Sequence, residues 1–200
     1  MSEQRRSVDP EILALLARED KAGAVTCALQ AYGPRILGYY TLVLRDGDAA
    51  DEVYGAFCEN LWRGIGTFRG EARFQTWAFQ IAHNVMCSYR TDPDQRRGRR
   101  LSTAELANLT QSARDGTPLF QHTTMKSAVE RLREQLDPDE RALLALRVDQ
   151  RLSWREVTQI LSQEEGVNEA VLRKRFERIK ERLRGLAELD GLLPTEDGKG

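Results

Sequence analysis

Residues 153–186 carry two apolar stripes at helical spacing with a short break between them, and this pattern limits the possible folds most. Ser153 and Glu156 form a capping box at the start of the first stripe, in which each side chain satisfies a free backbone amide of the other residue. The apolar positions are Trp154, Val157, Ile160 and Leu161 in the first helix, and Leu172, Phe176, Ile179, Leu183 and Leu186 in the second. Two helices with one apolar face each must pack together. The pattern therefore predicts a helix-turn-helix.

The outward face of the second helix is strongly basic. Residues 173–184 hold seven basic and two acidic side chains, although the formal charge of the whole chain is −1. Such a surface attracts the phosphates of DNA, and the first turns of a recognition helix meet base edges. The side chains expected to do so are Arg173, Lys174, Glu177 and Arg178. A solvated helix with charge pairs one turn apart is the alternative explanation.

The composition is that of a folded protein without a membrane segment. The chain has 200 residues, of which 40% are hydrophobic, and this is enough for one or two domains. No run approaches the ~18 apolar residues that would cross a membrane. The first ten residues also lack the apolar stretch of a signal peptide. We therefore expect a cytoplasmic protein with no membrane insertion.

Neither a catalytic site nor a metal site is indicated. Cys27, Cys58 and Cys87 stand about thirty residues apart with no CxxC pair, so we expect neither a disulfide framework nor a zinc ribbon. His83 and Cys87 share a helix face, but two ligands make no closed site. Because histidines are isolated, carboxylates are scattered and no glycine-rich phosphate loop occurs, we expect no enzyme activity and no cofactor.

The remaining periodicity predicts an all-α protein with two helical domains joined by a flexible linker. We expect an N-terminal helical bundle at 1–91, a linker at 92–125, a C-terminal helix-turn-helix domain at 126–193 and a disordered tail at 194–200. In the bundle, helices are expected at about 10–18 and 22–32, then from Pro34 to about 46, and at 48–63 and 74–90. Asp9 and Asp48 are the expected helix caps, and an Asp137-Pro138-Asp139-Glu140 cap begins the core of the second domain.

Two helices of the bundle have surfaces suited to partners. Residues 45–60 hold five acids and one base, so the helix at 48–63 presents Asp51 and Glu52 on an acidic face, with Tyr54 exposed beside them. A solvated acidic face is the alternative. The helix at 74–90 is expected to turn Phe74, Trp77, Ala78, Ile81, Val85 and Tyr89 inward. Segregation of acid and base along the chain favours a protein partner for one half and a nucleic-acid partner for the other.

The order of motifs resembles that of extracytoplasmic-function sigma factors, a compact branch of the sigma-70 family. Their second conserved region is matched by Asp48-Ala49-Ala50-Asp51, Phe57, Trp62, Phe68-Arg69-Gly70-Glu71, Phe74, Thr76-Trp77, Ile81-Ala82 and Asn84. Their fourth region is matched by Leu136, Pro138, Glu140-Arg141, Leu146-Arg147, Leu152-Ser153, Glu156, Ile160-Leu161, Arg175, Arg178 and Glu181-Arg182-Leu183. The two regions occur in the family's order and together span over half of the chain.

This resemblance implies a protein that binds core RNA polymerase and promoter DNA, with an anti-sigma factor as a further class of partner. It assigns polymerase binding to Asp48, Asp51, Glu52, Tyr54 and Phe57. It assigns the downstream promoter element, read as a flipped base, to Phe68, Arg69, Arg73, Asn84 and Arg90. In these roles Phe68 or Phe74 would stack on a base, whereas Trp77 is expected in the core.

The chain departs from the family pattern in two places. Tyr54-Gly55 stands where the family commonly has Gln-Glu, and the turn 162–168 is about four residues longer than usual.

Two other classes of function would each explain only part of the sequence. A stand-alone helix-turn-helix regulator would explain only the C-terminal half, and a helical adaptor that binds no DNA would need no basic recognition face.

Overall fold

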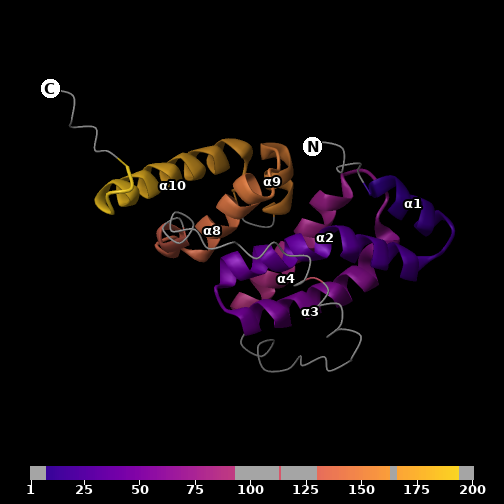
Figure 1. Ribbon diagram of the computed structural model, residues 1–200. Coiled ribbons are helices and arrows are strands. Elements are labelled where there is room, and N and C mark those ends of the chain that lie inside the picture. Colours follow the sequence, from indigo (N-terminus) through magenta and orange to yellow (C-terminus); the bar gives the residue numbers. More distant parts are fainter. Residues whose placement is uncertain (1–7, 93–112, 114–129, 163–165, 194–200) are drawn as a thin grey trace. The chain divides into compact units, whose positions relative to one another are not determined.

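The structure is a computed structural model that describes residues 8–92, 113, 130–162 and 166–193 (Figure 1). Within these residues all regular structure is helical, so the predicted all-α fold class is confirmed. The chain divides into two compact units, with the main division after Thr117. The expected linker and tail lie outside the described residues, apart from Asp92 and Ala113. Ala113 is helical and buried, near Gly33 of the N-terminal unit.

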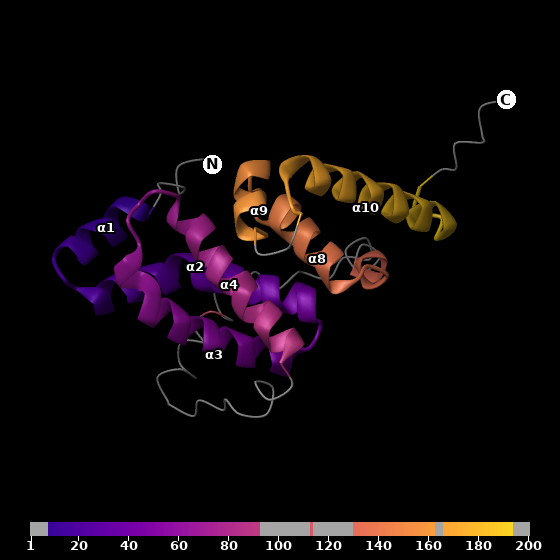
Figure 2. The same ribbon diagram turned by 180° about the vertical axis from the view of Figure 1, so that it is seen from behind.

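The N-terminal unit is a bundle around one long helix. Its elements are α1 (Asp9–Ala17), α2 (Lys21–Leu44), α3 (Gly47–Gly64), the 3-10 turn η1 (Ile65–Thr67) and α4 (Phe74–Thr91). The helix α2 contacts each of the others, and α3 also packs against α4 (Figures 1 and 2).

The helix α2 runs without a break through Pro34, so the expectation of two helices at 22–32 and from Pro34 is wrong. A proline inside a helix removes one backbone hydrogen bond and crowds the preceding turn, at a cost of ~3 kcal/mol. Tyr32 before the proline and Ile36 and Leu37 after it are all buried on the same core. Burial of one continuous stripe offsets the local cost, because each large apolar side chain contributes ~1.5–3 kcal/mol.

The capping aspartates differ from those expected in two places. Asp46, not Asp48, caps α3, and its carboxylate accepts hydrogen bonds from the amides of Asp48 and Ala49 at 3.0 and 3.1 Å. Arg45 makes the turn before this cap in the left-handed region, at φ 58°. Asp9 lies within the first turn of α1, and its carboxylate bonds to other helices.

The buried face of α4 is rotated from the one expected. The most buried positions are Phe74, Gln75, Thr76, Ala78, Phe79, Ala82, His83 and Met86, whereas Trp77, Ile81, Val85 and Tyr89 are only half-buried. The difference arises because Gln75, Thr76 and His83 are buried, whereas hydrophobicity alone predicts that these polar residues lie on the exposed face of the helix. Their partners are inside: Tyr39 of α2 and His83 Nδ1 share a hydrogen bond of 3.0 Å, and Cys87 Sγ lies 3.4 Å from His83 Nε2.

Tyr54 belongs to the core of the bundle, so the expectation that it is exposed is wrong. Its side chain is 1% exposed and its ring lies against Phe57, with 5.9 Å between the ring centroids. The hydroxyl lies over Gly33 of α2, where an added Cβ would come within 2.5 Å of the hydroxyl oxygen. At this departure from the family pattern, the Tyr54 side chain therefore fills the space that Gly33 leaves on the neighbouring helix α2.

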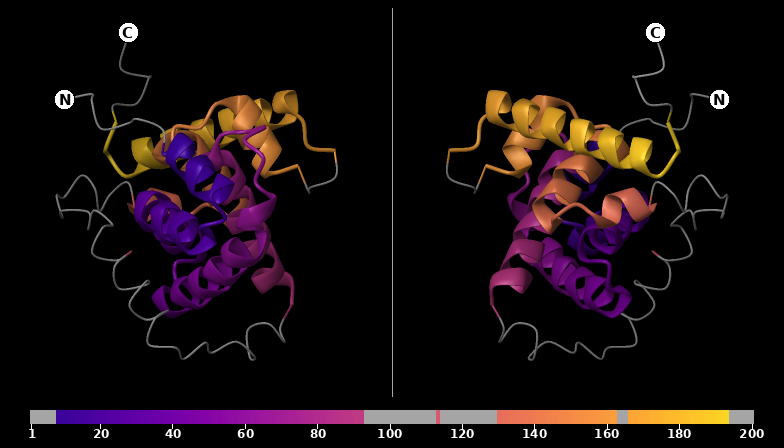
Figure 3. Two further views of the ribbon diagram at one scale, coloured as in Figure 1. Left: turned by 90° about the vertical axis from the view of Figure 1, so that its right-hand side faces the viewer. Right: turned by 90° about the vertical axis from the view of Figure 1, so that its left-hand side faces the viewer.

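The C-terminal unit contains the helix-turn-helix. After a helical stretch at 130–134, its elements are α8 (Pro138–Leu144), the π-helical turn η2 (Ala145–Asp149), α9 (Trp154–Ile160) and α10 (Glu169–Leu189), and α8 packs against α10 (Figure 3). Both predicted capping boxes are present, at Asp137 with Glu140 and at Ser153 with Glu156. Arg182 ties α10 to α8 through Glu140 and the Gln135 carbonyl.

Gly33→Ala tests the contact between α2 and α3. In an isolated helix this change would stabilise by about 1 kcal/mol, but the new methyl would collide with the Tyr54 hydroxyl, so we expect a lower melting temperature. In Gly33→Ala/Tyr54→Phe the oxygen is gone, and stability should recover above that of Gly33→Ala alone. Thermal unfolding of the two single variants and the double variant measures this coupling. Independent, additive effects would contradict the contact.

Candidate functional site

The acidic surface of α3 consists of Asp48, Asp51 and Glu52. Asp48 is exposed, and Asp51 and Glu52 are half-buried. Glu52 accepts a hydrogen bond of 3.3 Å from the Tyr89 hydroxyl, which joins this surface to α4. Asp48 lies in the first turn of α3, where negative charge also interacts favourably with the helix dipole.

The two aromatic residues assigned to the same site are not accessible. Phe57 is 1% exposed, like Tyr54, and both side chains lie in the core between α3 and its neighbours. Their predicted contact with polymerase therefore does not fit the structure. They hold α3 in place, and the surface offers only its carboxylates.

Phe68, Phe74 and Trp77 form an aromatic cluster beneath the loop of residues 64–73. The ring centroid of Phe68 lies 4.9 Å from that of Phe74 and 5.4 Å from that of Trp77, and the centroids of Phe74 and Trp77 are 5.3 Å apart. Phe68 is 8% exposed and Phe74 is 1% exposed, so the prediction that either ring is open to stack on a base is wrong. Trp77, expected in the core, is the member of the cluster with a partly accessible ring.

The basic residues of the downstream set lie near the two ends of α4. Arg69 and Arg73 are exposed in the loop before the helix, where Gly70 adopts a left-handed φ of 75°. Arg90 is in the last turn. At 1.5 Å per residue, Arg90 lies about 25 Å along the helix from Arg73. The set therefore forms a track along α4 and is not gathered in one pocket.

Asn84 lies between these ends and carries a buried polar atom without a partner. Its Oδ1 atom is buried and accepts no hydrogen bond from any of the residues that the structure describes. A buried acceptor left unpaired costs ~1–3 kcal/mol. A purely structural role for this oxygen would need a hydrogen bond from the loop backbone, and none is present among the described residues.

The upstream set, Arg173, Lys174, Glu177 and Arg178, lies on the exposed side of the first half of α10. The opposite side is the apolar stripe expected from the sequence, with Leu172 and Ile179 buried and Phe176, Leu183 and Leu186 half-buried. Asn168 caps the helix by accepting a hydrogen bond from the Val171 amide at 3.0 Å.

Arg173 is held in a fixed orientation that the sequence does not reveal. Its Nε and Nη2 atoms donate to one carboxylate oxygen of Glu169 at 3.0 and 2.6 Å. Its guanidinium also lies over the ring of Trp154, 5.2 Å from the centroid, and Arg147 lies 5.1 Å from the same centroid. One edge of the Arg173 guanidinium, formed by Nε and Nη2, is therefore engaged with Glu169. Within the set, Glu177 pairs with Lys180 at 2.7 Å.

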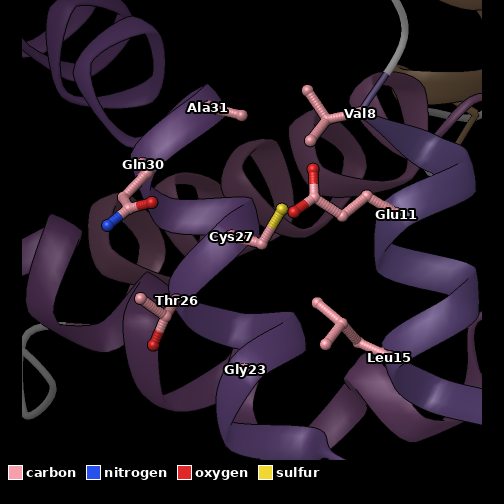
Figure 4. A pocket seen from close by; sticks show the side chains of 8 residues that line it. All are labelled: Val8, Glu11, Leu15, Gly23, Thr26, Cys27, Gln30 and Ala31. Carbon is pink, nitrogen blue, oxygen red and sulfur yellow. The ribbon is translucent and has the colours of Figure 1, made fainter. Parts of the chain in front are cut away.

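A cleft of about 550 Å³ opens between α1 and α2 (Figure 4). It is lined by Val8, Glu11, Leu15, Gly23, Thr26, Cys27, Gln30 and Ala31. The Cys27 thiol points toward the Glu11 carboxylate, and burial together with that carboxylate raises the pKa of the thiol. A thiol that stays protonated is a poor nucleophile and a poor metal ligand. Among the described residues no group of three His, Cys, Asp or Glu side chains could hold a metal ion.

None of the described helices is long and apolar enough to cross a membrane. The basic cluster at Arg96, Arg97, Arg99 and Arg100, another candidate for contact with DNA, lies outside the described residues.

Comparison with known proteins gives a family match for the part of the chain that contains α3 and α4. Residues 28–97, which include all of α3 and α4, match the sigma-70 region 2 family. A search of curated proteins gave no significant match. A solved structure described as CnrH in complex with the cytosolic domain of CnrY is similar, with a TM-score of 0.58 and 19% identity over 92% of this chain and 99% of that chain. At this identity the likeness shows a shared fold.

The family match falls on the segment whose motifs resembled the second conserved region of sigma factors, and it confirms that resemblance. The chain therefore carries a sigma-70 region 2 segment at residues 28–97.

Proposed function

We propose that this chain binds core RNA polymerase and directs it to promoters through two separate contacts with DNA. The observation that carries the proposal is the region 2 match at 28–97 in the same chain as a capped helix-turn-helix with a basic α10. A stand-alone helix-turn-helix regulator accounts for α10 but gives region 2 no role. Run-off transcription with core polymerase and a library of promoter fragments tests the proposal directly.

The acidic surface of α3 is the proposed polymerase contact. Three carboxylates at one end of a helix produce a local negative field, which speeds association with a basic partner more than it tightens the final complex. Glu52 is tied to Tyr89, so replacing it would also disturb α4. Asp48, which is exposed, is therefore a better position for testing charge than Glu52, and Asp51 lies one turn further along the same face.

The proposed path of the downstream strand runs along α4. Arg69 and Arg73 would hold phosphates at one end and Arg90 at the other, with Asn84 between them. The Oδ1 atom of Asn84 is an acceptor without a partner among the described residues, and because it is buried, contact with an amino group on a base edge requires a shift of this side chain. Trp77, with its half-buried ring, takes the stacking role that Phe68 and Phe74 cannot fill.

The upstream element is assigned to the exposed face of α10. Because one edge of the Arg173 guanidinium is engaged with Glu169, we assign base reading to Lys174 and Arg178, and phosphate contact to Arg173.

A regulatory protein partner is part of the proposal. The similar structure was solved with the cytosolic domain of CnrY bound to CnrH. By analogy, we propose that an anti-sigma domain binds the present chain and competes with polymerase or DNA for it.

Charge reversal tests the polymerase contact. Asp48→Lys and Asp51→Lys should each slow association with core polymerase and weaken its dependence on salt, since they remove attraction at long range. Glu11→Lys makes the same change of charge on the exposed side of α1 and should leave the association rate near that of wild type. Stopped-flow association at several salt concentrations gives the comparison. Equal effects of all three reversals would move the docking site away from α3.

Asn84→Ala tests the downstream contact. Because the Asn84 oxygen has no bond to lose, the melting temperature should not fall, whereas preference for one base in the downstream element should fall by roughly tenfold. A pre-melted promoter bubble should not restore the preference, since the pocket itself is changed.

Asn60→Ala is the matched control for Asn84→Ala. The Asn60 side chain donates to the Ala56 carbonyl at 2.8 Å, so its loss should lower stability and leave base preference unchanged. Open-complex formation on promoters that differ at single downstream positions measures both variants. The opposite pattern, in which Asn84→Ala lowers stability and keeps the preference, would make Asn84 structural.

Alanine substitutions in α10 separate base contacts from phosphate contacts. Lys174→Ala or Arg178→Ala should relax preference at one upstream position, worth ~1–3 kcal/mol, whereas Arg173→Ala should weaken all sequences alike and lower the salt slope by about 1. Arg184→Ala, which breaks a pair with Glu188 far along the helix, should change neither. Binding titrations against single-base variants give the answer. If Lys174→Ala and Arg178→Ala both kept wild-type preference, the reading face would be elsewhere.

A further inference from the structure

The carboxylate of Asp9 joins three helices of the N-terminal unit. From the first turn of α1, its Oδ2 atom accepts a hydrogen bond of 3.0 Å from the backbone amide of Phe74, the first residue of α4. Its Oδ1 atom accepts a hydrogen bond of 3.1 Å from the Tyr32 hydroxyl of α2. The bonded residues stand 65 and 23 positions away along the chain.

Asp9 takes the place of a missing cap on α4. The N-cap position of α4 is Arg73, whose side chain makes no capping hydrogen bond. The first amides of a helix have no partner within the helix, and a negative charge near them is favourable. A carboxylate from another helix therefore supplies the bond that local sequence does not.

A second contact from α1 reaches the loop of residues 64–73. The Leu13 side chain lies 3.3 Å from the place where a Cβ on Gly70 would be. Ile12, between Asp9 and Leu13, is fully buried. On another side of α1, the cleft of Figure 4 separates Glu11 and Leu15 from α2. The helix α1 thus packs against α2 and, on the side of Asp9 and Leu13, also reaches the loop and the start of α4.

The contact is fixed over the physiological pH range. Burial, and next the negative charge of Asp9, raise the pKa of Tyr32 to about 12. The hydroxyl therefore remains protonated and continues to donate to Asp9. Tyr32 also stacks on Phe74, with 5.6 Å between ring centroids. Asp9 from α1 and Tyr32 from α2 therefore both hold the start of α4.

We propose that Asp9 is a positioning residue that fixes the loop of residues 64–73 and the first turn of α4, and thereby sets base selectivity at the downstream element. The inference rests on the proposed function, in which this loop and α4 contact the promoter. Phe74 is in contact with Phe68 and Trp77, so a shift of its backbone would move both the proposed stacking ring and the loop that carries Arg69 and Arg73.

Asp9→Ala removes both hydrogen bonds, and two measurements follow the result in the full-length chain. Hydrogen exchange at the Phe74 amide should speed up by at least about tenfold, because no helical partner protects it. Preference for one base in the downstream element should fall by about fivefold to tenfold in open-complex assays with core polymerase. Affinity for core polymerase and preference at the upstream element should stay as in wild type.

Three further variants make the test specific. Tyr32→Phe removes the hydroxyl but leaves the cap on Phe74, so it should keep most of the base preference. Asp9→Asn keeps the shape with a single acceptor oxygen, so it should fall between wild type and Asp9→Ala, and it serves as the test if Asp9→Ala folds poorly. Val43→Ala opens a cavity at a fully buried position in the last turns of α2, so it should lower the melting temperature and leave base preference unchanged.

The outcomes separate this inference from the proposed function. If Phe74 exchange speeds up in Asp9→Ala while base preference is unchanged, the positioning role is wrong and the proposed function stands. The positioning role is also wrong if Val43→Ala loses as much downstream base preference as Asp9→Ala when the two variants lose equal stability. If wild type itself shows no downstream base preference, both proposals fail together.

Discussion

The N-terminal unit depends on the helix α2 remaining continuous through Pro34. Three of its tyrosines bond to neighbouring helices through their hydroxyls: Tyr32 to Asp9, Tyr39 to His83 and Tyr40 to the Ala82 carbonyl. At 24 residues α2 is about 36 Å long, which lets a single rigid rod set the positions of α1, α3 and α4. A break at Pro34 would divide these contacts between two independently tilted helices.

Buried aromatic residues and exposed charges have separate tasks in this unit. Tyr54, Phe57, Phe68 and Phe74 are all in the core, where they fix α3, the loop and α4 against one another. The surface is left to carboxylates on α3, to guanidinium groups on the loop, and to Asn84 and Trp77 on α4. A surface of charged and amide groups on rigid helices can engage partners with little reorganisation, because the aromatic contacts beneath it already hold the backbone.

In the C-terminal unit the helix-turn-helix is fixed by capping. Each of the three helix starts has a side chain that satisfies free amides, at Asp137, Ser153 and Asn168. The Arg182 contacts with Glu140 and Gln135 then join α10 to the start of α8. The guanidinium groups of Arg147 and Arg173 both lie against the ring of Trp154, so the start of α9 contacts both η2 and the first half of α10.

The sequence by itself determined the helical class, the capping boxes at Ser153 and Asp137, the apolar stripe of α10 and the charged members of both candidate surfaces. These features depend on residues a few positions apart, within reach of local hydrogen bonds and helical periodicity. Only the tertiary structure decided that α2 passes through Pro34, that α4 buries His83 and half-exposes Trp77, that Tyr54 is internal and that Asp9 caps α4. The partners in these cases come from other helices, 44 residues away for His83 and 65 for Asp9. Burying a polar side chain such as His83 costs free energy, which a hydrogen bond from such a distant partner offsets, and that balance is set by the fold.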